Sequence, residues 1–154
     1  MPLDTEQRFE ELKDRTAVTA AEVDELFEAL DTVTPEEILG EWKGGIFATG
    51  HHGSEGLEHI AWYGKTFNSR LDAKPLICHD EDGNLYSNDV MMGGEATLWE
   101  IRFRGRVSTS MVYNGAPVVD HFRKVDADTL VGVMDGAESV FDAGQHFYFF
   151  LERP

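Results

Sequence analysis

The chain has 154 residues, the length of one domain with its own hydrophobic core. It carries 29 Asp and Glu against 13 Lys and Arg, which gives a net charge of −16. Phosphates and acidic lipid headgroups repel such a polyanion, so nucleic acids and anionic membranes are not expected partners. No apolar run approaches the ~18 residues that span a bilayer, and the acidic first residues do not form a signal peptide. We expect a soluble, cytoplasmic protein that is a monomer or a homodimer.

The first forty residues predict helices. Apolar side chains recur at helical spacing, which predicts three helices, near 5–15, 20–31 and 35–39. Thr19 and Glu22 fit a capping box, in which each side chain accepts a hydrogen bond from the other residue's backbone amide. We expect residues 1–39 to pack as helices on a barrel formed by 40–154, the whole chain being one structural domain.

After Gly40 the pattern changes to short alternating segments, which predict strands. These segments are 41–48, 75–79, 85–90, 95–104, 106–113, 117–125, 129–135 and 145–152. Tight turns separate them, which favours an antiparallel meander over βαβ units. Closing the meander into a barrel removes its exposed edges. Residues 54–67 have helical spacing instead, so we expect a helix after the first strand that covers one mouth of the barrel.

Alternation along the strands predicts which side chains face inward. The bulkier alternating sets are expected to line the interior: Thr97, Trp99, Ile101 and Phe103 in one strand, and Val107, Thr109, Met111 and Tyr113 in the next. The last segment, 146–151, is apolar on both faces. One face can fill the barrel, and the N-terminal helices can cover the other. The expected apolar lining of a cavity is Trp99, Phe103, Met111, Tyr113 and Tyr148.

Several motifs carry a resemblance to a known family. They are Gly40-Glu41-Trp42-Lys43-Gly44, Thr49-Gly50-His51, Trp62-Tyr63-Gly64-Lys65 and, later, Asp120-His121-Phe122-Arg123-Lys124-Val125-Asp126. The chain resembles the bacterial GXWXG proteins over about 35–95, and their companion domain of unknown function over about 96–154. The resemblance implies a closed barrel of the lipocalin or calycin type that binds a hydrophobic small molecule. It brings no established catalytic residues.

Within the first motif, Gly40, Trp42 and Gly44 are expected to be structural. Glycine permits close approach of the chain, and the large indole can close one end of the tapered barrel. A ligand contact by Trp42 is the alternative. Cys78, the only cysteine, lies in a short apolar run, which predicts a buried and unreactive thiol.

The polar candidates each have two interpretations. His51 either anchors its loop or faces a ligand at the barrel mouth, and Tyr63 and Lys65 lie near the same place. Lys65 either pairs with a ligand carboxylate or extends over the barrel rim. The histidines lack the spacing of a zinc site, so no metal is expected.

The charged strand around residue 121 leaves two orientations open. If His121 and Arg123 face inward, they offer a donor and a cation for an anionic headgroup. If Val118 and Phe122 face inward, the two polar side chains lie on the outer surface. Asp120 is on the opposite face and is expected to pair with a cation on a neighbouring strand.

These observations predict a binding protein for a fatty acid or another hydrophobic or amphipathic molecule, with no cofactor. Two alternatives remain: a haem-binding barrel that resembles nitrobindin, and a small-molecule enzyme that uses Tyr113, Asp120 and His121. No nucleophile elbow, phosphate loop or dinucleotide motif supports catalysis, so no catalytic residue is assigned.

Overall fold

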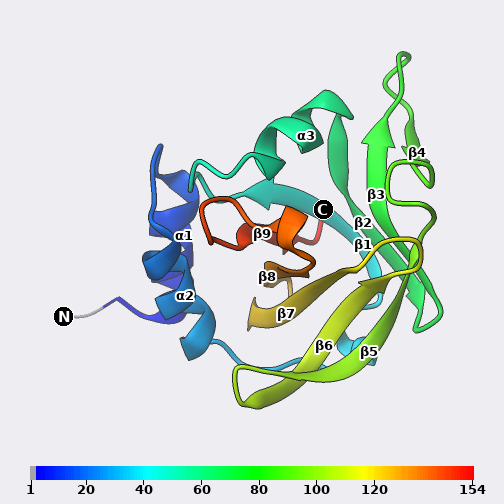
Figure 1. The fold of residues 1–154 in the computed structure, drawn as a ribbon. Helices are drawn as coiled ribbons and strands as arrows, with labels where there is room; N and C mark the ends of the chain where they lie inside the picture. Colours follow the sequence, from blue (N-terminus) through cyan, green and yellow to red (C-terminus); the bar gives the residue numbers. More distant parts are fainter. Residues whose placement is uncertain (1–2) are drawn as a thin grey trace.

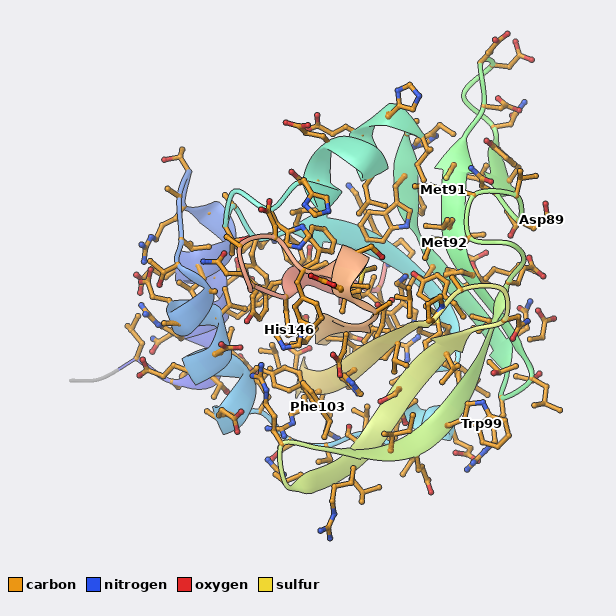
Figure 2. The ribbon with its side chains drawn as sticks, in the orientation of Figure 1. Asp89, Met91, Met92, Trp99, Phe103 and His146 are labelled. Carbon is orange, nitrogen blue, oxygen red and sulfur yellow. The ribbon has the colours of Figure 1, made fainter. Side chains whose placement is uncertain are left out.

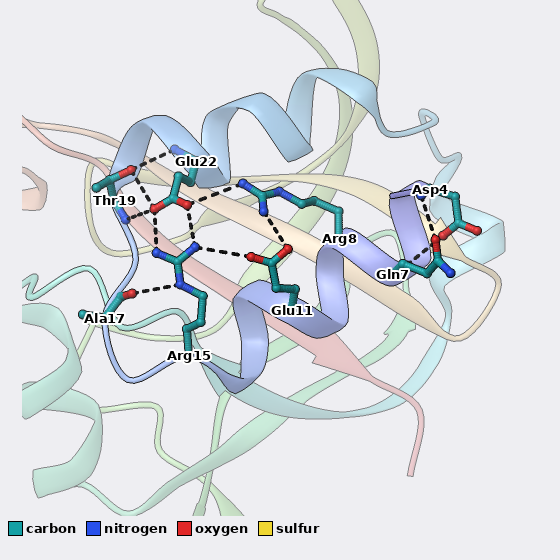
Figure 3. Close-up of polar contacts among 8 residues, drawn as sticks. All are labelled: Asp4, Gln7, Arg8, Glu11, Arg15, Ala17, Thr19 and Glu22. Atoms are coloured by element: carbon teal, nitrogen blue, oxygen red, sulfur yellow. Dashed lines mark hydrogen bonds and ion pairs between the residues drawn. The ribbon is translucent and has the colours of Figure 1, made fainter. Parts of the chain in front are cut away.

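Two short helices begin the chain, α1 (Thr5–Asp14) and α2 (Ala20–Ala29). The computed structural model describes residues 3–154 and places both helices on one side of a barrel (Figure 1). The Thr19 and Glu22 capping box is formed, and the Arg15 guanidinium joins α1 to α2 through Glu22 (Figure 3). A 3₁₀ turn, η1 (Pro35–Ile38), follows. The prediction of N-terminal helices is confirmed.

The barrel is a closed antiparallel ring of eight strands, which confirms the predicted fold class. Around the ring the order is β1-β9-β8-β7-β6-β5-β3-β2, and β2 pairs again with β1. A ninth strand, β4, pairs with β3 outside the ring. The strands are β1 (Gly40–Ile46), β2 (Trp62–Ser69), β3 (Asp72–His79), β4 (Leu85–Ser87), β5 (Ala96–Phe103), β6 (Arg106–Tyr113), β7 (Val118–Asp126), β8 (Thr129–Gly136) and β9 (Phe147–Glu152).

The region predicted to be one helical insertion divides into a helix and a strand. Helix α3 (Gly53–His59) follows β1 as expected, but β2 begins only three residues after it. The expected helix over 54–67 is therefore wrong in its second half. The pairing of β2 with β3 contains register shifts on both sides of Gly64, and these shifts interrupt the alternation that would have indicated a strand.

Strand β9 separates the two hydrophobic clusters of the molecule. Phe147, Phe149 and Leu151 point into the barrel. Tyr148 and Phe150 point outward, into a second cluster with the apolar faces of α1 and α2. The prediction that one face of this segment fills the barrel while the helices cover the other is confirmed.

The inward face predicted for β5 is wrong. Ala96 and Leu98 face the interior, and Trp99 lies on the outside with 51% of its surface exposed (Figure 2). Phe103 packs under the helices, and Val107 at the start of β6 is exposed. The prediction placed the bulkier side chains of β5 inside, but on this strand the smaller side chains, Ala96 and Leu98, face the barrel interior. Met111 and Tyr113 face inward as expected.

No helix between residues 3 and 154 is long and apolar enough to cross a membrane.

Candidate functional site

A cavity of about 290 Å³ opens at the end of the barrel near α3. Helix α3, the loop between β4 and β5, and the 3₁₀ turn η2 (Glu138–Val140) surround it. Figure 2 labels Met91 and Met92 on that loop. The lining is mostly apolar: His51, His52, Gly53, Gly56, Leu57, Trp62, Lys65, Leu76, Met91, Met92, Tyr113, Val118, Met134, Ser139, Val140, Phe147 and Phe149. The volume lies at the lower limit of the range of ~300–1,000 Å³ typical of small-molecule sites.

Trp42 fills the interior toward the other end of β1. Its ring is buried, and its Nε1 donates a hydrogen bond to the Ile38 carbonyl at 2.8 Å. The Arg153 guanidinium lies over the indole, 4.1 Å from the ring centroid. Trp42 does not line the cavity. These contacts support the interpretation of Trp42 as a structural plug.

Gly40 and Gly44, on either side of Trp42, are each required to be glycine for a different geometric reason. Gly40 has a φ of +120°, a conformation that side chains other than glycine rarely adopt. A Cβ at Gly44 would overlap the ring of Trp62. Because Gly44 lacks a side chain, the Trp62 indole can lie across it and form part of the cavity wall.

Three polar side chains meet at the floor of the cavity. Lys65 Nζ lies 3.1 Å from Asp120 Oδ2 and donates to the Tyr113 hydroxyl at 3.4 Å. The Tyr113 hydroxyl in turn donates to Asp120 Oδ2 at 3.3 Å. Lys65 Nζ also donates to the Pro75 carbonyl at 3.3 Å. Lys65 and Tyr113 are each 3% exposed and line the cavity, and Asp120 is fully buried in contact with both.

Burial shifts the titration of this cluster toward uncharged forms. It lowers the pKa of the Lys65 ammonium, and the nearby Asp120 carboxylate opposes the shift. It raises the pKa of the Asp120 carboxyl, which Lys65 opposes, and raises that of the Tyr113 hydroxyl well above its usual value. Whether the pair is charged or neutral, Lys65 and Asp120 together carry no net charge.

His51 at the cavity mouth is held by two hydrogen bonds. The Gly53 amide donates to Nδ1 at 2.9 Å, so Nε2 carries the proton and donates to the Val140 carbonyl at 2.8 Å. Burial lowers the pKa of this ring, which keeps it neutral. His52 and Asp142 lie beside it, but the His51 ring has no free nitrogen for a metal. His51 thus anchors its loop and also lines the mouth.

His121 and Arg123 lie on the outer face of β7. Of the two orientations, Val118 and Phe122 face the interior. His121 stacks on Phe103 at 3.8 Å between ring centroids, which places its ring outside the barrel wall. Arg123 donates to the Phe27 carbonyl of α2 at 3.1 Å. The inward orientation is therefore wrong for both.

His121 also joins Ser110 and Asp135 in a row across β6, β7 and β8. Ser110 Oγ lies 2.7 Å from Nδ1, and Asp135 Oδ2 lies 3.2 Å from Nε2. The row has the composition of a hydrolase triad, but Ser110 is only 1% exposed and Phe103 covers the histidine. A substrate cannot reach this serine, so the row is a structural network.

Of the ten residues predicted to contact a ligand, His51, Lys65 and Tyr113 line the cavity. Tyr148 is wrong as an interior residue, since its hydroxyl donates to Asp24 of α2 at 2.8 Å. Tyr63 packs against His79, and Met111 is buried in the interior cluster without lining the cavity. The other four, which lie on the outer face, are Trp99, Phe103, His121 and Arg123.

The sequence analysis missed the pairing of Asp120 with Lys65. A cation on a neighbouring strand was expected, but β7 pairs with β6 and β8, and Lys65 is on β2 across the barrel. The Lys65 side chain does not extend over the rim, because it points inward to Asp120 and is only 3% exposed. The one available signal was an isolated carboxylate on the same strand face as Val118 and Phe122.

Comparisons with known proteins match both halves of the barrel. The family profile of the GXWXG proteins matches residues 25–83, and that of the domain of unknown function DUF4334 matches residues 94–153. The chain is similar to a protein from Thermomonospora curvata with a crystal structure, at 37% identity over 99% of each chain and a TM-score of 0.89. None of the curated proteins matches the sequence. Strands β1 to β3 thus come from the first matched segment and β5 to β9 from the second.

Proposed function

The chain belongs to the GXWXG family and carries the DUF4334 domain, and from the cavity of its barrel we propose that it binds a small hydrophobic or amphipathic molecule. The observation that carries the proposal is the cavity itself. Aromatic and aliphatic side chains form most of its wall, and few polar groups interrupt them. Burying an apolar ligand there gains about 25 cal/mol per Å² removed from water.

The polar end of the ligand is proposed to be uncharged. Lys65 and Asp120, 3.1 Å apart, together carry no net charge in either protonation state. A fatty-acid carboxylate at this floor would therefore be a buried charge without a counter-ion, in a chain whose net charge is −16. An alcohol, ester or carbonyl group hydrogen-bonds to Lys65 or Tyr113 without that cost.

Calorimetric titration with decanol and decanoate tests both parts of the proposal. We expect saturable binding of decanol, and binding of decanoate weaker by at least about tenfold, or 1.4 kcal/mol. Leu57→Trp narrows the mouth from α3 and should weaken binding of decanol. Leu57→Met, of similar volume to leucine, should not. Absence of saturable binding by both ligands would overturn the proposal, and preference for decanoate would overturn the uncharged polar end.

Haem is the weaker candidate for this cavity. Of the histidines along its wall, His51 uses both ring nitrogens within the protein. His52 is exposed at the rim with Nδ1 3.2 Å from Asp142. A cavity of about 290 Å³ is also small for a porphyrin. Reconstitution with hemin tests this alternative. We expect no Soret band that depends on His52, so the spectra of the wild-type protein and of His52→Ala should be the same.

A further inference from the structure

Lys65 alone among the five lysines of the chain has its ammonium group inside the protein. Its Nζ lies 5.1 Å from the centroid of the Phe149 ring and 5.6 Å from that of Trp62, and both rings line the cavity. We propose that the cavity takes an aldehyde or ketone, and that Lys65 Nζ binds its carbonyl carbon covalently as an imine with Asp120 as the counter-ion. The inference rests on the proposed function, because the apolar part of the carbonyl compound must occupy the cavity.

An imine requires a neutral amine, and the floor of the cavity supplies one. Asp120 Oδ2, 3.1 Å from Nζ, can accept the ammonium proton. Asp120 Oδ1 is buried and receives no hydrogen bond from the described residues, so the carboxylate charge is stabilised through one oxygen only. Burial moves the pKa values of Lys65 and Asp120 toward each other, which favours the neutral pair. A lysine desolvated in this way is an effective nucleophile.

The step balances without any co-reactant. The Lys65 nitrogen forms a bond to the carbonyl carbon, and one proton passes from that nitrogen to the carbonyl oxygen, which gives a carbinolamine. Protonated Asp120 then gives its proton to the new hydroxyl group, directly or through the Tyr113 hydroxyl, which contacts both side chains. The carbon–oxygen bond breaks, water leaves, and a protonated imine remains beside the Asp120 carboxylate. No atom is oxidised or reduced.

The position of the amine distinguishes this arrangement from an ion pair that only stabilises the fold. Lys65 and Tyr113 form part of the cavity wall, so a ligand in the cavity contacts both. The other ion pairs between described residues are nearer the surface and do not adjoin this cavity, apart from His52 with Asp142 at the rim. Apolar side chains of similar volume often replace a buried ion pair without loss of stability. Stability alone therefore does not explain the Lys65–Asp120 pair, whereas reaction with a carbonyl ligand does.

Reductive trapping with decanal tests the inference on the wild-type protein. Decanal and sodium cyanoborohydride are added near neutral pH, and the product is analysed by intact mass and by peptide mapping. We expect one decyl group, located on Lys65, before the exposed Lys43 reacts. An excess of decanol should slow the trapping because it competes for the same cavity. Trapping on Lys43 first, or on Lys65 without competition by decanol, would overturn the inference.

Three variants separate the roles of the cluster. Lys65→Arg removes the primary amine and places a guanidinium beside Asp120, so no decyl group should be trapped at position 65, even at a decanal concentration that saturates the cavity of the wild-type protein. Tyr113→Phe keeps the ring and removes the hydroxyl. If the Asp120 proton passes through this hydroxyl, we expect trapping about 10²-fold slower, at the lower end of the ~10²–10⁴-fold range of general acid catalysis. Asp120→Asn removes the counter-ion, and an aromatic aldehyde bound to this variant should lack the red-shifted absorption of a protonated imine.

Decanol binding also keeps the two proposals apart. If decanol binds and decanal is not trapped on Lys65, the carbonyl inference fails and the proposed function stands. If decanol does not bind, the proposed function fails. Trapping on Lys65 no faster than on Lys43 would then show the reactivity of an ordinary lysine, and the carbonyl inference would fail as well. If the Lys65→Arg variant does not fold, the peptide map of the wild-type protein decides the question.

Discussion

Trp42 supports the barrel through packing at the level of a single residue. Trp42→Ala removes a buried indole from the interior cluster together with its hydrogen bond to Ile38 and its contact with Arg153. We expect the free energy of unfolding to fall by about 3–5 kcal/mol, the cost of deleting a large buried aromatic side chain. Urea denaturation measures this loss. Folded variant protein should bind decanol normally, and an equally stable variant without binding would assign Trp42 to the binding site.

Arg123 is a second residue whose buried side chain acts on the fold. Its guanidinium donates to the carbonyls of Phe27 and Phe103 and lies 4.5 Å from the centroid of the Phe27 ring. Arg123→Met removes both of these hydrogen bonds, although the Leu30 amide still donates to the Phe27 carbonyl, so we expect a loss of about 1–3 kcal/mol in the free energy of unfolding. Titrations with decanoate and decanol should change alike, because Arg123 lies outside the cavity. A loss confined to decanoate would contradict this position.

At the scale of elements, the capping box of α2 holds the helical cover in place. The Thr19 hydroxyl accepts from the Glu22 amide, and Arg15 lowers the pKa of the Glu22 carboxyl to about 2 (Figure 3). Thr19→Ala removes the cap and should lower the free energy of unfolding by about 1 kcal/mol. Thr19→Ser keeps a hydroxyl and should retain most of the stability that the cap contributes. Thermal unfolding of the two variants, followed by circular dichroism, measures the difference, and equal stabilities would contradict a role for the cap.

Sequence analysis predicted correctly the elements whose pattern is not interrupted. The helices before residue 31 and the strands from β5 to β8 repeat their apolar residues, β9 is a continuous apolar run, and turn residues separate the strands. Strand β2 was missed because Gly64 and three register shifts in its pairing with β3 break its alternation. The inward face of β5 was mistaken for a different reason. Helices cover part of the outer wall, so outward residues such as Phe103 are also partly buried, and alternation alone does not identify the interior.

The candidate site belongs to the scale of the whole molecule. Lys65 and Asp120 are 55 residues apart, in strands that do not pair, and they meet only because the sheet closes into a ring. The sequence contains both residues but no local pattern that links them. His51 differs, because its motif and its position before α3 led to two interpretations, a loop anchor or a residue at the mouth, and the ring has both positions in the structure. A site built across a barrel can be predicted only after the strand register is known.

The dependence of stability on pH is also a property of the whole molecule. Burial lowers the pKa values of His51 and His121 in the folded state, with Asp135 opposing the shift at His121. Below pH ~6.5 the unfolded chain therefore binds protons that the folded chain does not. We expect the free energy of unfolding to decrease as the pH falls from 7 to 5, by up to about 1.4 kcal/mol per pH unit for each histidine. Urea denaturation at a series of pH values measures the slope.

Matched variants isolate the two histidines from the rest of the charge. Acidification also reduces the repulsion within a chain of net charge −16, which opposes the histidine effect, so the informative quantity is the difference in slope between variant and wild type. Because glutamine cannot take up the proton, His51→Gln and His121→Gln should each make the dependence of the free energy of unfolding on pH less steep. His59→Gln, at an exposed histidine, should leave it unchanged. If His121→Gln retains the wild-type slope, the ring takes up its proton over the same pH range in the folded and unfolded states, and a steeper slope would mean that the folded ring is protonated and forms an ion pair with Asp135.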